Sequence, residues 1–171
     1  LRAWHLGFKS LWYDEAVIWR VLQGGWAGAA EPSGWIAVLG ANAASNSAPP
    51  LHVLLVAALT GPDAGEAALR AASAVAGVAC IPATWLLARQ FVAPRYALVA
   101  ALLVALSPVQ VQYSQQLREY ALACLLSALL TWSWVRFLGR PGAARSVQVA
   151  ALTAVALLTQ YGLALLAAAL A

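Results

Sequence analysis

Three long stretches of this chain carry almost no charge, and they constrain the fold more than any other feature. They cover residues 71–88, 96–113 and 120–138, and a further apolar run extends from residue 146 to the end of the chain. A helix needs roughly 17 to 25 apolar residues to cross a bilayer, and each run reaches that range. The sequence therefore predicts an all-α polytopic bundle with about four spanning helices: 69–91, 96–113, 119–138 and 146–171.

Composition also favours a membrane protein over a soluble one. Hydrophobic residues make up 63% of the chain and charged residues 9%, whereas about one quarter of the residues of soluble domains are charged. The basic residues stand near the ends of apolar runs, so the net charge of +4 indicates membrane topology and not nucleic-acid binding. Cys80 and Cys124 lie in apolar segments and are expected to be buried small side chains. The chain lacks an initiating Met and stops inside an apolar run, which favours a truncated part of a larger protein.

Arginine placement predicts the topology. Positive charge gathers in the connections 89–95 and 139–145, which are therefore expected on the cytoplasmic side. Residues 1–68 and the connection 114–119 then face the extracytoplasmic side of the cell (inner) membrane. All six acids fall on that side: Asp14, Glu15, Glu31, Asp63, Glu66 and Glu119.

The outer loop is expected to contain two short helices that lie on the membrane surface. Residues 49–60 are apolar, but about twelve helical residues span only ~18 Å against a hydrocarbon core of about 30 Å. Residues 11–23 form the other predicted helix, with Ser10 as its N-cap and Gly24-Gly25 closing it. The Gly-, Ala- and Ser-rich segment between these helices is predicted to be irregular.

The adjacent acids Asp14 and Glu15 are the most informative polar residues. A helical wheel places Glu15 on the apolar face with Ile18, and Asp14 beside it, while Arg20 lies opposite. Acids in the first turn suit the helix dipole, which is one interpretation. The dipole would be served equally on the water-facing side, without the cost of holding carboxylates near apolar surface. We therefore favour a functional site that faces a cavity at the membrane surface.

The stretch YSQQLREY, residues 113–120, is the second candidate. Arg118, together with Gln115 and Gln116, offers hydrogen-bond donors to a phosphate that enters from the lipid side. The alternative is that Arg118 only pairs with Glu119 and anchors the helix ends. Arg70, at the start of the first span, is either a second cation for the phosphate or a snorkelling anchor.

Two further residues are weaker candidates for substrate contacts. His52 follows the Pro-Pro-Leu sequence, and a lone histidine there is more typical of a polar side chain at the interface. Tyr120 ends the second motif. The tryptophans suit an aromatic belt at the membrane interface. No spacing typical of metal ligands is present, and no cofactor is expected from the residues themselves.

Four segments in this order resemble the amino-terminal half of the GT-C membrane glycosyltransferases. They are LWYDEA (11–16), APPLHVLLVAALTG (48–61), ALRAASAVAGVACIPATWLLARQF (68–91) and ALSPVQVQYSQQLREYAL (105–122). The chain is most similar to the protein O-mannosyltransferase and aminoarabinose-transferase superfamily, in the branch called glycosyltransferase family 39.

This resemblance implies an enzyme that moves a sugar from a polyprenyl-phosphate donor to an acceptor glycan, lipid or protein. Transfer would occur on the extracytoplasmic face, with inversion. Asp14 would be the catalytic base and Glu15 its neighbour. The second motif would place Ser114, Gln115, Arg118 and Tyr120 near the donor.

Two departures from the family pattern limit what the resemblance implies. Ala48 stands where many relatives have His or Lys, which puts that donor contact in doubt. Glu119 and Tyr120 stand where some relatives have Asp, so a divalent metal is left open and is not carried over.

Two other classes of protein were weighed against the enzyme. A transporter would be expected to carry charges or Gly/Pro breaks at mid-membrane. Here the ionisable residues gather at one surface, and the mid-span Pro82 is not accompanied in sequence by a polar partner. A non-catalytic membrane scaffold would tolerate replacement of Asp14.

Overall fold

The computed structural model describes residues 2–3, 6–8, 10–26, 32–45, 48–61 and 63–170. Within these ranges the chain forms helices joined by turns and short connections, with no strand, which confirms the predicted all-α class. The helices are α1 (Tyr13–Trp26), α2 (Pro32–Ser45), α3 (Leu51–Leu59), α4 (Glu66–Ala88), α5 (Pro94–Leu106), α6 (Pro108–Ser114), α7 (Tyr120–Gly139), α8 (Ala143–Thr159) and α9 (Leu163–Leu170).

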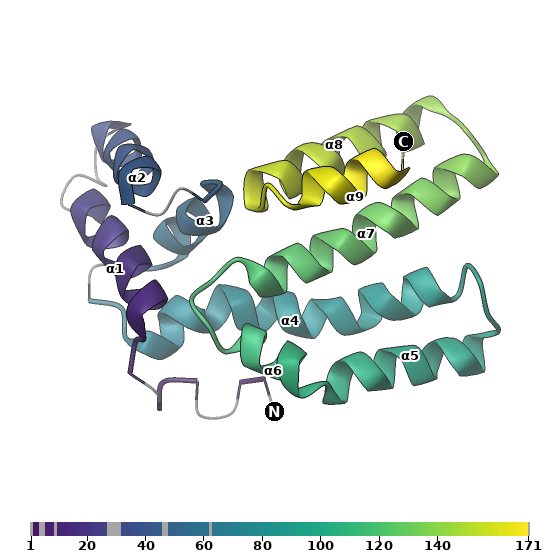
Figure 1. Cartoon of the computed structure of the whole chain (residues 1–171), viewed down its shortest axis with the longest axis horizontal. Coiled ribbons are helices and arrows are strands. Elements are labelled where there is room, and N and C mark those ends of the chain that lie inside the picture. The colour runs from purple at the N-terminus through teal and green to yellow at the C-terminus, as the bar shows by residue number, and fades with distance from the viewer. Residues whose placement is uncertain are drawn as a thin grey trace.

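The longest helices lie lengthwise beside one another. Figure 1 shows α4 between α5 and α7, with α8 and α9 on the far side of α7. The short helices α1, α2 and α3 gather around the start of α4. We call this the acidic end, because the described acids lie there: Asp14, Glu15, Asp63, Glu66 and Glu119. The opposite end, with the connections 89–95 and 139–145, is called the arginine end.

In the described part of the chain, two helices are long and apolar enough to cross a membrane. They are α4, with 23 residues, and α7, with 20. The bent pair α5 and α6 makes a third if it counts as one span. This count is below the four spans that the apolar runs predict, and two local features account for the difference.

The first feature is a break in the run 96–113. The axes of α5 and α6 differ by 59°, and the bend lies at Ser107 and Pro108. Proline has no N–H to donate to the carbonyl of Val104, and it disfavours helical geometry in the residue before it. Ser107 is accordingly non-helical, and its hydroxyl caps α6 by accepting a hydrogen bond from the Gln110 N–H at 3.4 Å.

The second feature lies in the last apolar run. It was predicted as one helix over 146–171, but α8 ends at Thr159, and α9 turns back along α8 and α7 (Figure 1). The turn contains Gln160 and Gly162. Leu126 and Leu130 of α7, with Val149 and Ala156 of α8, form the buried core of this part.

The acidic end has its own apolar core. Ile18, Val21 and Leu22 of α1 are at most 2% exposed, while Arg20 is exposed, as the helical wheel predicts. They pack with Val53 of α3, and further members of the cluster come from α2, α4 and the connection after α6.

α2 itself was not expected. The segment was predicted to be irregular because of its glycines and serines. Ala37, Ala41, Ala43 and Ala44 have high helix propensity, however, and Pro32 starts the helix, where proline is favoured. Val38 then buries against the core of α1 and α3.

Candidate functional site

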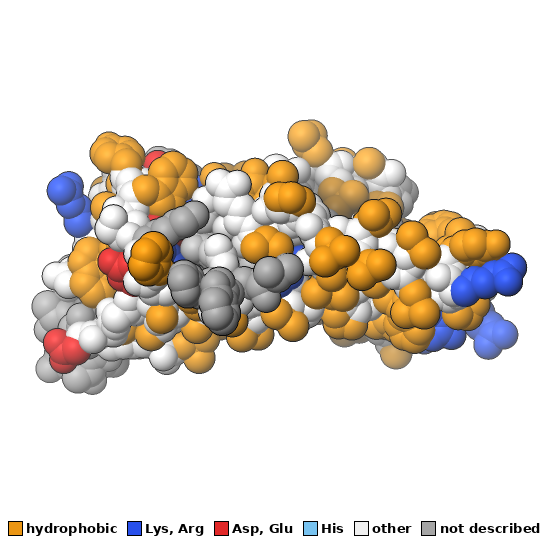
Figure 2. Space-filling view, turned by 90° about the horizontal axis from the view of Figure 1, so that it is seen from below, with side chains coloured by type: hydrophobic (Ala, Val, Ile, Leu, Met, Phe, Trp, Pro, Cys, Tyr) orange, Lys and Arg blue, Asp and Glu red, His pale blue; other side chains and the backbone are white. Residues whose placement is uncertain are grey.

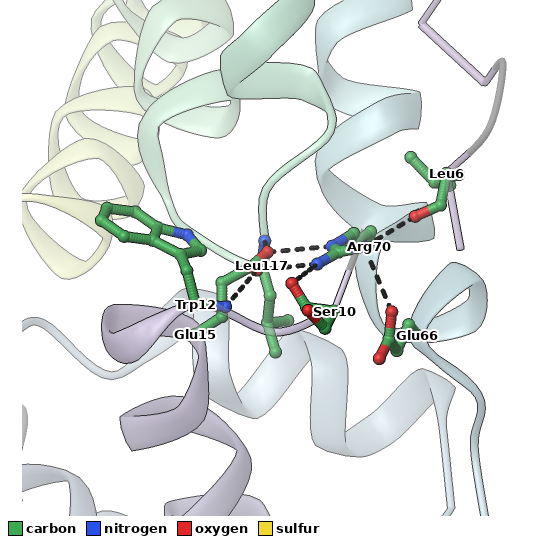
Figure 3. A network of polar contacts seen from close by, with 7 residues as sticks. All are labelled: Leu6, Ser10, Trp12, Glu15, Glu66, Arg70 and Leu117. Atoms are coloured by element: carbon green, nitrogen blue, oxygen red, sulfur yellow. Dashed lines mark hydrogen bonds and ion pairs between the residues drawn. The ribbon is translucent and has the colours of Figure 1, made fainter. Parts of the chain in front are cut away.

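Glu15 is a buried carboxylate that α1 holds against α4. Its exposed fraction is 1%, and that of Arg70 is 2%. Arg70 donates two parallel hydrogen bonds to it, from Nε to Oε1 at 2.9 Å and from Nη2 to Oε2 at 2.7 Å. Figure 3 shows the two side chains pointing toward each other from α1 and α4. Such a two-bond contact is the strongest geometry available to an arginine and a carboxylate.

Further contacts extend the pair into a network. The backbone N–H of Leu117 donates to Glu15 Oε1 at 2.6 Å, and the N–H of Trp12 donates to Oε2 at 3.4 Å. Arg70 also donates to the carbonyl of Leu6 at 2.8 Å (Figure 3). One ion pair therefore joins the chain before α1, the first turn of α1, α4 and the connection between α6 and α7.

These contacts set the charge state of Glu15. Burial by itself raises the pKa of the Glu15 carboxyl, but the hydrogen bonds from Arg70 and Leu117 and the positive charge of Arg70 lower it more. The net result is a pKa below the ordinary value, so Glu15 stays ionised at neutral pH. A carboxylate held in this way accepts a further proton only with difficulty.

A cavity of about 630 Å³ lies beside the pair. Glu15 and Arg70 form part of its wall. Its other lining residues come from the chain before and at the start of α1, from the end of α5, from α6 and from the following connection: Ser10, Trp12, Leu106, Pro108, Val111, Gln112, Gln115 and Gln116. The cavity thus combines an apolar wall with three glutamine amides and one ion pair.

The helix break that forms one wall of the cavity is held by Arg2. Arg2 is 4% exposed and donates to the Val104 carbonyl at 2.7 Å, which Pro108 leaves without a helical partner. It also donates to the Gln110 carbonyl at 2.8 Å and to the Ser114 hydroxyl at 2.6 Å. Arg2 therefore supplies the donors that the broken span lacks.

Asp14 differs from Glu15 in its burial and in its contacts. It is partly exposed, and it is not among the described residues that line the cavity. No hydrogen bond or ion pair joins it to the described part of the chain. It stands in sequence between the cavity residues Trp12 and Glu15, one step around α1. Asp14 keeps a carboxylate that is not committed to another described group.

His52 is buried away from the cavity. Its exposed fraction is 2%, and its Nε2 lies 3.2 Å from the Ser73 hydroxyl. Because that hydroxyl donates to the Arg118 carbonyl at 3.0 Å, Nε2 carries the hydrogen. Burial, together with the positive charge of Arg118, lowers the pKa of His52 to about 4. His52 is thus a neutral link between α3, α4 and the connection after α6, which differs from the interfacial position expected for it.

Arg118 follows the cavity residues Gln115 and Gln116 in sequence but does not line the cavity. Its side chain is 13% exposed, and Nη2 is 3.3 Å from Oε1 of Glu119. The guanidinium also lies 5.5 Å from the centre of the Tyr120 ring. Tyr120 in turn packs against Tyr113, with ring centres 5.1 Å apart. The pairing of Arg118 with Glu119, one of the two interpretations from the sequence, is present.

The structure therefore brings together three of the predicted site residues: Glu15, Arg70 and Gln115. Asp14 and Arg118 flank the cavity in sequence, whereas His52 and Tyr120 do not line it. Sequence reasoning missed Arg2 and Gln112. A signal for Gln112 was present, because a glutamine inside an apolar run is costly unless it faces a polar cavity or a partner.

The described residues contain no group of three or more His, Cys, Asp or Glu side chains that could hold a metal ion.

Comparison with known proteins identifies the family. A family model described as dolichyl-phosphate-mannose-protein mannosyltransferase matches residues 47–171, which include Arg70 and the second motif but not α1. Searches of curated proteins and of solved structures found no match. The match covers well over half of the chain. The chain therefore belongs to the dolichyl-phosphate-mannose-protein mannosyltransferase family, membrane glycosyltransferases that use polyprenyl-phosphate-linked sugar donors.

Proposed function

We propose that this chain acts in an inverting glycosyltransferase reaction on the extracytoplasmic face of the cell membrane. The observation that carries the proposal is the cavity at the acidic end, where α1, α4 and the broken span α5–α6 meet. Its apolar wall suits the first units of a polyprenyl chain. Its amide and charged groups suit the phosphate and the sugar.

Asp14 is the base in this proposal, and Glu15 positions it. A general base needs a carboxylate that is free to take a proton from the acceptor. Glu15 accepts hydrogen bonds from Arg70, Leu117 and Trp12, so it is already occupied. Asp14 is partly exposed on the same helical turn. The buried pair of Glu15 with Arg70 orients the start of α1 and therefore the carboxylate of Asp14.

The donor phosphate is proposed to meet the connection after α6. Gln115 and Gln116 line the cavity there, and Arg118 follows two residues later. Arg70 donates most of its hydrogens to Glu15 and to backbone carbonyls, so its charge contributes less than a free cation would. Arg118, whose side chain is 13% exposed, is the stronger candidate for stabilising the departing phosphate.

The outer location is tested by chemical labelling in intact cells. Cysteines at Ser45 and Gln116 should react with a membrane-impermeant thiol reagent, and one at Pro141 should not, in a background without Cys80 and Cys124. Labelling at Pro141 with protection at Ser45 would reverse the assigned orientation.

The catalytic assignment is tested by two substitutions in the full-length protein, one at the proposed base and one at the proposed phosphate contact. Asp14→Asn keeps the shape but removes the basic oxygen, so turnover with defined polyprenyl-phosphate sugars should fall about 10² to 10⁴-fold at unchanged stability. Arg118→Ala should mainly raise the KM for the donor. The anomeric configuration of the product reports inversion.

Glu15→Gln is the matched control. It weakens the buried pair with Arg70, so it should lower both stability and activity, whereas Asp14→Asn should lower activity alone. Near-normal sugar transfer by the Asp14→Asn variant would show that Asp14 is not the base. Asp14 would then be an acid that only complements the helix dipole.

A further inference from the structure

The arginine end carries a separate group of positive charges. Figure 2 shows blue Arg side chains gathered at the end of the molecule opposite to most of the acidic side chains, with a further blue side chain at the acidic end. Five arginines belong to this end: Arg89, Arg95, Arg136, Arg140 and Arg145. The acids of the described chain lie at the other end of the long helices, so no carboxylate partner is close to these arginines.

A second cavity lies among these charges, between the ends of α4 and α7. It is open, has a volume of about 200 Å³, and is lined by Leu86, Arg89, Gln90, Trp132 and Arg136. Two arginines, one directly after α4 and one in α7, therefore face one space. Two guanidinium groups repel each other, and an anion between them removes that cost.

Aromatic contacts hold both guanidinium groups in place. Arg89 lies over the ring of Trp85 at 4.5 Å, and Arg136 lies over the ring of Trp132 at 4.7 Å. Stacking uses the flat face of a guanidinium and leaves the N–H groups at its edge available for hydrogen bonds. Among the described residues, neither guanidinium donates a hydrogen bond or joins an ion pair. Both side chains are exposed, so these donors are available to a ligand.

We propose that this cavity binds the phosphate of an anionic phospholipid headgroup such as phosphatidylglycerol. Arg89 and Arg136 would share the phosphate, and Gln90 would lie near the glycerol. The lipid source is favoured over soluble phosphate because the cavity lies at the ends of the two helices that are long enough to span. Headgroups lie at that depth, where tryptophan is also favoured, and Leu86 and Trp132 offer an apolar wall to the start of the acyl chains.

This site is independent of sugar transfer, because it lies at the other end of α4 and α7 from Glu15 and Arg70. Its role is to clamp α4 to α7 through one bound lipid. Arg145 supports the α7 side by donating to the Arg136 carbonyl at 3.1 Å.

The test uses the full-length protein in phosphatidylcholine nanodiscs with rising fractions of phosphatidylglycerol, and native mass spectrometry counts the retained phosphatidylglycerol. The double variant Arg89→Gln with Arg136→Gln should lose affinity about 30-fold, since each arginine near the membrane surface contributes about fivefold. Arg95→Gln is the matched control. Arg95 belongs to the same end and stacks on Tyr96 at 4.8 Å, but it does not line the cavity.

Each outcome decides the proposal. Loss of phosphatidylglycerol from the double variant, with retention by wild type and Arg95→Gln, supports it. An equal loss from Arg95→Gln would show only a diffuse basic surface, and unchanged retention by the double variant would show no site; either overturns the proposal. Displacement of the lipid by inorganic phosphate at equal concentration would assign the site to a soluble anion, and this outcome would also overturn the proposal. Sugar transfer in the same nanodiscs confirms that the variants are folded.

Discussion

The two ends of the long helices differ in how their charged side chains are paired. At the acidic end, Arg70 and Glu15 satisfy each other across 55 residues of chain, and Arg2 reaches the carbonyl of Val104 across 102. At the arginine end, Arg89 and Arg136 stack on tryptophans four residues before them in the chain, and no described acid pairs with them.

The difference separates long-range from local contacts. At the acidic end the buried polar groups are paired with one another. Removal of one of them therefore leaves another charge or carbonyl buried without a partner. The arginine end is open, because its charges keep their solvent or lipid contacts whichever neighbour is removed. Substitutions should therefore affect stability strongly at the first end and weakly at the second.

The largest effect is expected for Glu15→Ala. It leaves Arg70 as a buried charge without its main partner, so the free energy of unfolding in mixed micelles should fall by about 3 to 5 kcal/mol. Glu66→Ala is the control. Glu66 also pairs with Arg70, but its side chain is 35% exposed and its Oε2 lies 3.6 Å from Nη1, so its removal should lower the free energy of unfolding by less than about 1 kcal/mol. Equal losses in both variants would contradict a special role for the buried pair.

A pH dependence of similar size is expected from His52. Its pKa is about 4 in the folded chain against an ordinary 6.5, so the unfolded chain takes up a proton first as the pH falls. Stability present above pH 6.5 should therefore be lost progressively down to about pH 4, by about 3 kcal/mol in total.

His52→Gln removes this contribution and so isolates it. The lowered pKa of Glu15 also reduces stability as the pH falls, but only at lower pH. The free energy of unfolding of wild type and variant is measured against pH. Parallel curves between pH 6.5 and 4 would show that His52 is not buried as a neutral side chain.

Gly77→Ala should have a smaller effect. A Cβ at Gly77 would stand 2.7 Å from the Cβ of Ser114, so α4 and α6 must separate at the point where Arg2 holds the break. Overpacking of this kind costs about 1 to 3 kcal/mol. Gly40→Ala in α2 is the matched control, because nothing lies within 4 Å of its added Cβ. It should be neutral or stabilising in the same unfolding measurement, and a loss equal to that of Gly77→Ala would remove the packing argument.

The smallest effect is expected at the arginine end. Arg136→Gln removes one exposed contact with Trp132, so it should change the free energy of unfolding by less than about 1 kcal/mol in neutral detergent. A loss as large as that of Glu15→Ala would show that the two ends do not differ.

Periodic apolar patterning was sufficient for much of the fold. The all-α class, the spans that became α4 and α7, and the buried face of α1 follow from the number and spacing of apolar residues. The break at Pro108 was also present in the sequence as Ser-Pro in the middle of an apolar run. It was not predicted, because a proline bends some spanning helices and interrupts others, and the outcome depends on what satisfies the freed carbonyl.

At the candidate site, too, part of the structure followed from the sequence and part was decided by tertiary contacts. The sequence by itself singled out Asp14, Glu15, Arg70 and Gln115, because charged and amide side chains are costly beside apolar helices and are kept there for a reason. It could not say that Glu15 pairs with Arg70 and leaves Asp14 uncommitted. Partners 55 residues apart are decided by how α1 packs on α4 and by where Leu117 places its N–H. Apolar periodicity specifies which face of a helix is buried, whereas only the packing of helices decides which polar groups meet inside.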